Sequence, residues 1–145
     1  MKQESNTLKV LCEISIGELI DKIAILRIKS RRVRDPIHLR SIRYEIKHLE
    51  EVLASLNLNK TETNRFLEKL IKVNKTIWRY CEKVHHHQNG KHIRAGFEAL
   101  KTNDIRYEIK RQINARYGSS VQEIKVFKNG EAKRVRDLKT KSSPR

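Results

Sequence analysis

Seven polar residues in two distant stretches of the chain have the types and spacing to form one site. Glu18 and Asp21 share a helical flank with Ile25 and Ile28. A helix that is apolar on two flanks packs between neighbours, so both carboxylates should be partly buried and need partners. The candidate partners are two cations one turn apart and three nearby polar residues: Arg106, Lys110, Asn103, Asp104 and Asn114.

This polar constellation has two interpretations. In the first, it lines a pocket that holds a small anion between helices. In the second, it is a buried ion-pair network that fixes the register of the helices. The residue types leave both open. Neither includes a nucleophile, and the sequence contains no Ser/His/Asp arrangement, Walker-type loop or glycine-rich phosphate cradle. We therefore identify no catalytic residue and no cofactor, and favour a role without catalysis.

A histidine cluster, His85–His87 with His92, invites a metal interpretation. Consecutive helical residues point about 100° apart, so three adjacent histidines do not converge well on one ion. Cys81 and His85 form only a single pair spaced by four residues. We expect a solvated loop rather than a metal site.

Basic residues offer a different chemistry, the binding of phosphate groups. They gather at the tip of a predicted helical hairpin, opposed there only by Asp35 and Glu45, and in a basic tail. Such regions can track a phosphate backbone in a salt-sensitive and sequence-tolerant way. Few aromatic residues lie between these cations. The alternative to phosphate binding is that they form only a solvated helical surface. The tip residues are Arg27, Arg31, Arg32, Arg34, Arg40 and Arg43, and the tail residues are Lys133, Arg134 and Arg136.

The composition limits the class of protein that carries these residues. The 145 residues include 33 Lys and Arg against 17 Asp and Glu, which gives a formal charge of +16. Only 5 Gly and 2 Pro argue against a β-sandwich and against a Gly/Pro-rich disordered chain. Two cysteines are too few for a disulfide scaffold and favour the reducing cytoplasm. We find no apolar run that could span a membrane and no signal-peptide pattern.

Helix signals dominate the first half of the chain. Ser15 and Glu18 predict a capping box, in which the Ser15 hydroxyl accepts from an early N–H and Glu18 reaches back. The apolar stripe behind it ends near Arg34, and Asp35-Pro36 then begins a second helix. So short a connection predicts an antiparallel hairpin.

The second half predicts two more helices and a tail. After a turn-like stretch over 56–64, apolar residues from Phe66 to Val84 predict a third helix. A fourth runs from about Lys91 to Tyr117, with a break suggested at 102–104. Residues 9–14 and 121–127 suggest a small two-stranded β element. We therefore predict an all-α antiparallel bundle as one domain over 1–127, followed by a disordered basic tail over 128–145.

Several short motifs follow one another along the chain: ISIGELIDKI with ILRIK from residue 14, NKTIW from 74, TNDIR from 102, IKRQIN from 109, and the pair Gly118-Ser119. They resemble those of a bacterial family of small helical proteins that is catalogued as a domain of unknown function. The resemblance covers roughly residues 10–127 and implies an all-helical core with a polar constellation, but no activity. The chain departs from the family after Trp78, where acidic residues are usual and a mixed stretch stands here.

Three hypotheses for function follow from the sequence. The first is a cytoplasmic protein that binds nucleic acid, the ribosome or another polyanion through the hairpin tip and the tail. The second is a helical interaction module, a coiled-coil-like homodimer or accessory subunit, in which the charge is incidental. The third is an all-α enzyme or sensor that holds a small anion at the polar constellation. None of them involves a membrane.

Overall fold

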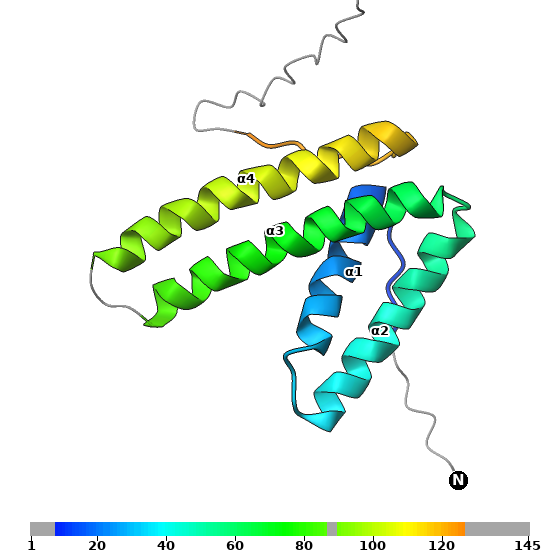
Figure 1. The fold of residues 1–145 in the computed structure, drawn as a ribbon. Coiled ribbons are helices and arrows are strands. Elements are labelled where there is room, and N and C mark those ends of the chain that lie inside the picture. Colours follow the sequence, from blue (N-terminus) through cyan, green and yellow to red (C-terminus); the bar gives the residue numbers. More distant parts are fainter. Residues whose placement is uncertain (1–7, 87–89, 127–145) are drawn as a thin grey trace, which may run out of the picture.

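The four predicted helices are present in the structure, a computed structural model that describes residues 8–86 and 90–126. The fold of these residues is all-α, as the sequence predicts (Figure 1). The helices are α1 (Ile16–Ser30), α2 (Pro36–Ser55), α3 (Lys60–His86) and α4 (Lys91–Tyr117).

The helix ends follow local capping chemistry. Ser15 precedes α1, and its side chain accepts a hydrogen bond from the Glu18 amide at 3.1 Å. Asp35 does the same for α2, accepting from the His38 amide at 3.0 Å, with Pro36 at the first helical position. Gly118 ends α4 with a φ of 64°, in the left-handed region that glycine adopts without strain.

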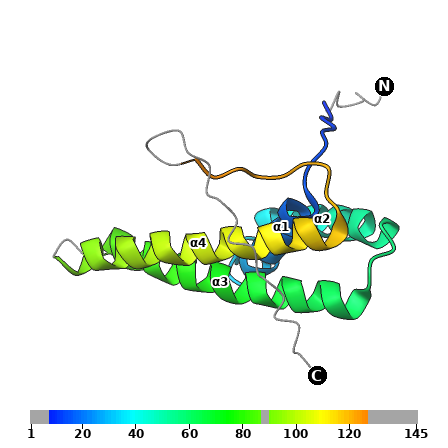
Figure 2. The same ribbon diagram turned by 90° about the horizontal axis from the view of Figure 1, so that it is seen from above.

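Two antiparallel hairpins of unequal size make up the fold. The longer hairpin consists of α3 and α4, and the shorter one of α1 and α2 (Figure 1). Helix α1 lies behind the α3–α4 hairpin in the view of Figure 1 and contacts all three other helices; Figure 2 shows the same arrangement from above. Among the described residues, α2 packs on α1 alone.

The core surrounds α1 and omits most of α2. It consists of apolar side chains from three helices, and α2 contributes no fully buried residue. Only Leu49 and Leu53 of α2 are partly buried against this core. The buried core residues are Leu19, Ile20, Ile23, Ala24, Leu67, Leu70, Ile109 and Ile113.

Three boundaries differ from the sequence prediction. Helix α1 ends at Ser30 rather than near Arg34. Helix α3 begins at Lys60, inside the predicted turn, because the Asn59 side chain accepts from the Glu62 amide at 3.0 Å and caps it. Helix α4 continues through the predicted break, where the Thr102 hydroxyl donates to the Glu98 carbonyl at 2.6 Å within the helix.

The predicted β element is not shown. Residues 8–14 and 121–126 contain no strand, and the second segment runs back beside α4 (Figure 2). Contacts from Glu123 and Lys125 to α4 side chains hold it there. The predicted tail lies outside the described residues.

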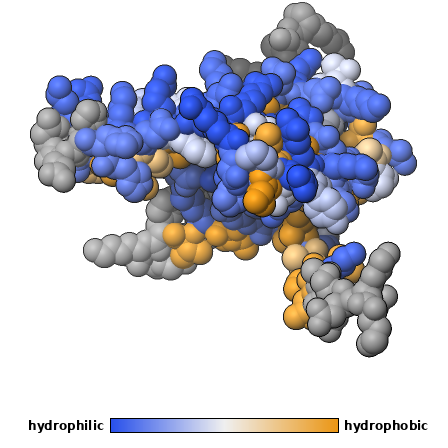
Figure 3. All heavy atoms as spheres, turned by 90° about the horizontal axis from the view of Figure 1, so that it is seen from below, coloured by the Kyte–Doolittle hydropathy of each residue, from blue (hydrophilic) through white to orange (hydrophobic). Residues whose placement is uncertain are grey.

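The described surface is mostly polar. Figure 3 shows a largely hydrophilic lower face with hydrophobic side chains gathered mainly along one edge. Leu8, Val10 and Leu11, in the segment before α1, are each at least 87% exposed. Across the described ranges, none of the helices combines the length and apolar character needed to cross a bilayer.

Candidate functional site

The structure brings the polar constellation together between α1 and α4, with a contribution from α3. Asp21 is fully buried, and Arg106 donates to both of its carboxylate oxygens through Nε, at 3.1 and 3.0 Å. Asn74 of α3 donates to Asp21 at 2.8 Å. The bond to Asp21 outweighs burial and raises the pKa of Arg106 above its ordinary value. One buried carboxylate thus joins three helices.

Lys110 forms a second centre of the constellation, one turn further along α4. Its side chain is 9% exposed, and its Nζ lies 3.0 Å from Glu18 and 2.5 Å from Glu123. Burial disfavours its charge, but the hydrogen bonds to Glu123 and Glu18 outweigh that effect and raise the pKa of Lys110. The Glu18 side chain pairs with Lys110 and does not close the predicted capping box.

Asn114 completes the constellation at the N-terminus of α1. Its side-chain oxygen accepts from the Gly17 amide at 2.7 Å, and the Ser119 hydroxyl accepts from the Ile16 amide at 3.2 Å. The first N–H groups of α1 are thus bound by side chains from the end of α4 and beyond it. This contact requires Gly17, since a Cβ there would lie 2.7 Å from the Lys110 carbonyl oxygen.

The two remaining members lie at the rim. The Asn103 side chain is exposed and accepts from Arg106 at 3.4 Å. Asp104 forms an ion pair with Lys125 of the segment after α4. Within the described residues, each of the predicted cations and carboxylates therefore has a charged partner.

An open groove of about 510 Å³ lies over the constellation. Its charged lining consists of three acids (Glu13, Glu18, Glu123) and three cations (Arg106, Lys110, Lys125). All three cations are engaged by carboxylates. A small anion entering the groove would have to compete with these carboxylates, so the contacts favour the network interpretation over an anion pocket.

The predicted hairpin-tip cations fall into two groups. Arg27 pairs with Glu50 of α2, and Arg32 pairs with Glu82 of α3 and lies 4.8 Å from the ring centre of Trp78. The others are exposed, and they form no ion pair within the described residues: Arg31, Arg34, Arg40 and Arg43. The tail residues Lys133, Arg134 and Arg136 lie outside the described residues.

A row of cations along α3 was missed by the sequence analysis. Asn74 donates to Asp21 of α1, and Trp78 lies beside Arg32 of the connection after α1, so that side of α3 faces the α1–α2 hairpin. The centre of the row lies about 160° around the helix from this side. All of its residues are exposed, and none forms an ion pair within the part of the chain that the structure describes. We call it the α3 row: Arg65, Lys69, Lys72, Arg79 and Lys83.

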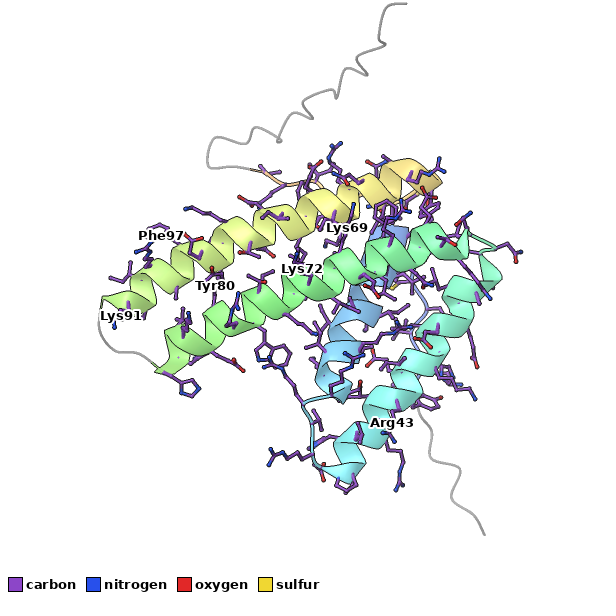
Figure 4. The ribbon with its side chains drawn as sticks, in the orientation of Figure 1. Arg43, Lys69, Lys72, Tyr80, Lys91 and Phe97 are labelled. Carbon is purple, nitrogen blue, oxygen red and sulfur yellow. The ribbon has the colours of Figure 1, made fainter. Side chains whose placement is uncertain are left out.

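The signal for the α3 row was present in the sequence. Its spacings of four, three, seven and four residues place every member on one helical stripe. The cations of the hairpin tip and the tail stand close together in the sequence, whereas those of this stripe are dispersed among apolar residues. In Figure 4, Lys69, Lys72 and Tyr80 follow one another along α3, and Lys91 lies at the same end of the hairpin as Tyr80.

A pocket of about 500 Å³ lies at the far end of the α3 row, between α3 and α4. Three exposed cations contribute to it, and only Glu98, already paired with Lys101 at 3.2 Å, adds a negative charge. Arg79 and Lys83 lie 5.9 and 5.8 Å from the ring centre of Tyr80. The lining residues are Tyr80, Lys83, Lys91, Arg94, Ala95 and Glu98.

The histidines form no metal centre in the described residues. His85 and His86 are exposed but belong to the last turn of α3 rather than to the expected loop, and His87 lies outside the described residues. No group of three or more His, Cys, Asp and Glu side chains that could hold a metal is found among the side chains described here.

Comparisons with known proteins add no name to these sites. No family model matches the chain, and no match is found among the curated proteins or among the solved structures. The family resemblance thus remains an expectation from the motifs, and the interpretation of the sites depends on their geometry.

Proposed function

We propose that this protein binds nucleic acid or another polyanion without catalysing a reaction, with the α3 row as its main contact. The observation that supports the proposal most directly is that the charges of this row are exposed and, among the described residues, unpaired. Its five cations are exposed and form no ion pair in the described ranges, and only Arg65 has a carboxylate nearby that acts on it, Glu62, which Arg116 already binds. An unpaired cation keeps its charge available for phosphate, and the release of counterions from nucleic acid favours binding.

The shape of the α3 row supports an extended ligand. Its 18-residue span from Arg65 to Lys83 corresponds to about 27 Å of helix. At 3.4 Å per phosphate on one strand, that length matches about eight phosphates. The row is also straight, because it lies on one uninterrupted helix. Such a row suits a phosphate backbone better than a small compact anion.

The hairpin tip and the tail supply further contacts in this proposal. Arg40 and Arg43 lie one turn apart on α2, and Arg31 and Arg34 lie in the connection between α1 and α2. We include the tail cations Lys133, Arg134 and Arg136 from the sequence. Both described cysteines, Cys12 and Cys81, are exposed and unpaired with each other, which fits the reducing cytoplasm as the place of action.

The test is a fluorescence-anisotropy titration of the full chain with labelled RNA and DNA over a series of salt concentrations. Wild type should show a linear fall of log K with log salt. The triple variant Lys69→Gln, Lys72→Gln, Arg79→Gln should bind at least tenfold more weakly and reduce the slope by about 3. The matched control, Lys22→Gln, Lys101→Gln, Lys47→Gln, removes three cations that are already paired.

Equal losses in the two triple variants would contradict a role for the α3 row. A third variant with Lys133, Arg134 and Arg136 changed to Gln measures the tail in the same titration. Absence of salt-dependent binding by wild type would overturn the proposed function as a whole.

A second candidate function, a helical interaction module, is favoured by an apolar row on α4. Ile93, Phe97 and Leu100 lie on one helical stripe and are 57%, 61% and 67% exposed. A monomer rarely leaves such a row uncovered. Sedimentation equilibrium across a concentration range tests this candidate, since Phe97→Ser should dissolve an oligomer held by that row. A protein that is monomeric at all concentrations would contradict this second candidate function.

A further inference from the structure

We infer that the pocket between Tyr80 and Arg94 accepts one unstacked base of a single-stranded nucleic acid, with its phosphates on the neighbouring cations. This inference rests on the proposed function and specifies its ligand. It concerns the pocket at the end of the α3 row, which combines charge with an aromatic ring.

The pocket has the size and lining for a nucleotide unit. Its volume of about 500 Å³ lies within the usual range for small-molecule sites. Lys83 comes from α3, and Lys91 and Arg94 come from α4, so positive charge converges from both helices. These three cations form no ion pair within the described residues, unlike Glu98, whose charge is offset by Lys101. The lining therefore carries an excess of positive charge.

Tyr80 supplies an aromatic surface on which a base can stack. Its ring is partly exposed and belongs to the pocket lining. Aromatic side chains beside a basic track bind unpaired bases by stacking, with little dependence on sequence. Arg79 and Lys83, which flank the ring, belong to the α3 row itself. A strand that follows the row thus reaches the ring at its end.

The other candidate rings are less suited to this role. Trp78 lies beside the connection between α1 and α2, where the Arg32 guanidinium lies over its ring, 4.8 Å from the ring centre. Tyr44 is exposed on α2, but His48 already lies against it with the ring centres 4.1 Å apart. Tyr107 is 8% exposed and donates to the Glu123 carbonyl at 3.3 Å.

Base stacking at Tyr80 selects for single strands. In a duplex the bases are paired and stacked on each other, and one must be extruded at a cost before it can meet a protein ring. A single strand presents its bases freely. Removal of the ring should therefore weaken single-strand binding and leave duplex binding unchanged, because the duplex contacts only the cations.

The experiment measures the affinities of full-length wild type, Tyr80→Leu and Tyr80→Phe for oligo(U), oligo(dT) and a duplex of the same length. Tyr80→Leu should lose about 5- to 150-fold in single-strand affinity, and Tyr80→Phe should keep it. The control Tyr44→Leu removes an exposed ring outside the pocket and should leave all affinities unchanged. The oligo(U) and oligo(dT) arms separate RNA from DNA as the source of the base.

The outcomes separate the inference from the proposed function. Salt-dependent binding of wild type with equal affinities for Tyr80→Leu and Tyr80→Phe would overturn the base pocket and keep the polyanion interface. An equal loss of single-strand and duplex binding in Tyr80→Leu would also overturn it. Absence of binding by wild type would overturn both. Thermal unfolding of each variant by circular dichroism shows whether the fold is kept, and Tyr80→Phe retains the ring in either case.

Discussion

The polar constellation and the α3 row both contain Arg and Lys. The cations of the constellation are bound by carboxylates, whereas those of the α3 row form no ion pair in the described residues. At the constellation, Arg106 and Lys110 are largely buried and each is bound by carboxylates. Along α3, Lys69 and Lys72 are exposed and without an acidic partner in the described residues. Charge that is paired and buried serves the fold, whereas charge that is unpaired and exposed is free for a ligand.

Removal of the buried carboxylate should have the largest effect. Asp21→Ala leaves the Arg106 guanidinium and the Asn74 amide without their acceptor. Removing one partner of a buried ion pair costs about 3–5 kcal/mol in the free energy of unfolding. Urea unfolding followed by circular dichroism measures the loss. Glu45→Ala is the control, because Glu45 pairs with Lys22 while both side chains are more than 40% exposed, and it should cost less than about 1 kcal/mol. Similar losses in the two variants would contradict a structural role for Asp21.

The close approach of α1 to α4 should make Gly17 intolerant of any side chain. A Cβ at Gly17 would lie 2.7 Å from the Lys110 carbonyl oxygen and 2.8 Å from Asn114 Oδ1. The two helices would have to separate, which should cost about 1–3 kcal/mol in the free energy of unfolding. Gly96→Ala is the matched control, since nothing lies within 4 Å of a Cβ there. That change should stabilise α4 by about 0.5–1 kcal/mol. A neutral result for Gly17→Ala in thermal unfolding would show that this contact is loose.

In the absence of a ligand, repulsion among the cations of the α3 row should lower the free energy of unfolding. Lys69 and Lys72 repel each other across one turn, as do Arg79 and Lys83. Changing Lys69, Lys72 and Arg79 to Gln should therefore raise the free energy of unfolding by about 0.5 kcal/mol at low salt. Added salt should remove the difference, because it screens exposed charges. A loss of stability in this variant would indicate that the cations of the α3 row stabilise the fold, as those of the constellation do.

Lys110 should give the constellation a dependence on alkaline pH. Its pKa is raised in the folded state, so the stability from its ion pairs is complete below the ordinary lysine pKa of about 10.4. That contribution is lost as the pH rises through the higher pKa of the folded protein. The difference in unfolding free energy between wild type and Lys110→Met should shrink over this interval in urea titrations. A difference independent of pH would mean that Lys110 contributes by packing alone.

Much of the fold was predictable because local signals determined it. The caps Ser15 and Asp35, with Pro36 and Gly118, mark helix ends through hydrogen bonding and backbone conformation that neighbouring residues control. The start of α3 was missed because Asn59 stands among turn-forming residues, and its cap depends on one side-chain bond. The prediction of a break in α4 failed because polar residues at 102–104 can bond within a helix or across it.

The candidate site was predictable only in part. The residues of the constellation were identified because buried carboxylates require partners, and the structure pairs Glu18 with Lys110 and Asp21 with Arg106. Glu123 as a second partner of Lys110 could not be predicted, because it depends on where the segment after α4 runs. The α3 row, in contrast, could have been found, because its spacing places it on the face of the helix away from the apolar stripe that begins at Phe66.

The sparse packing of α2 makes it a separate unit of local unfolding. With no buried residue and a contact to α1 alone within the described ranges, α2 can open while α1, α3 and α4 keep their shared core. Its amides should then exchange with deuterium at a lower free energy than those of the core helices. Arg40 and Arg43 therefore lie on a helix that can unfold locally, whereas the cations of α3 belong to a helix of the core.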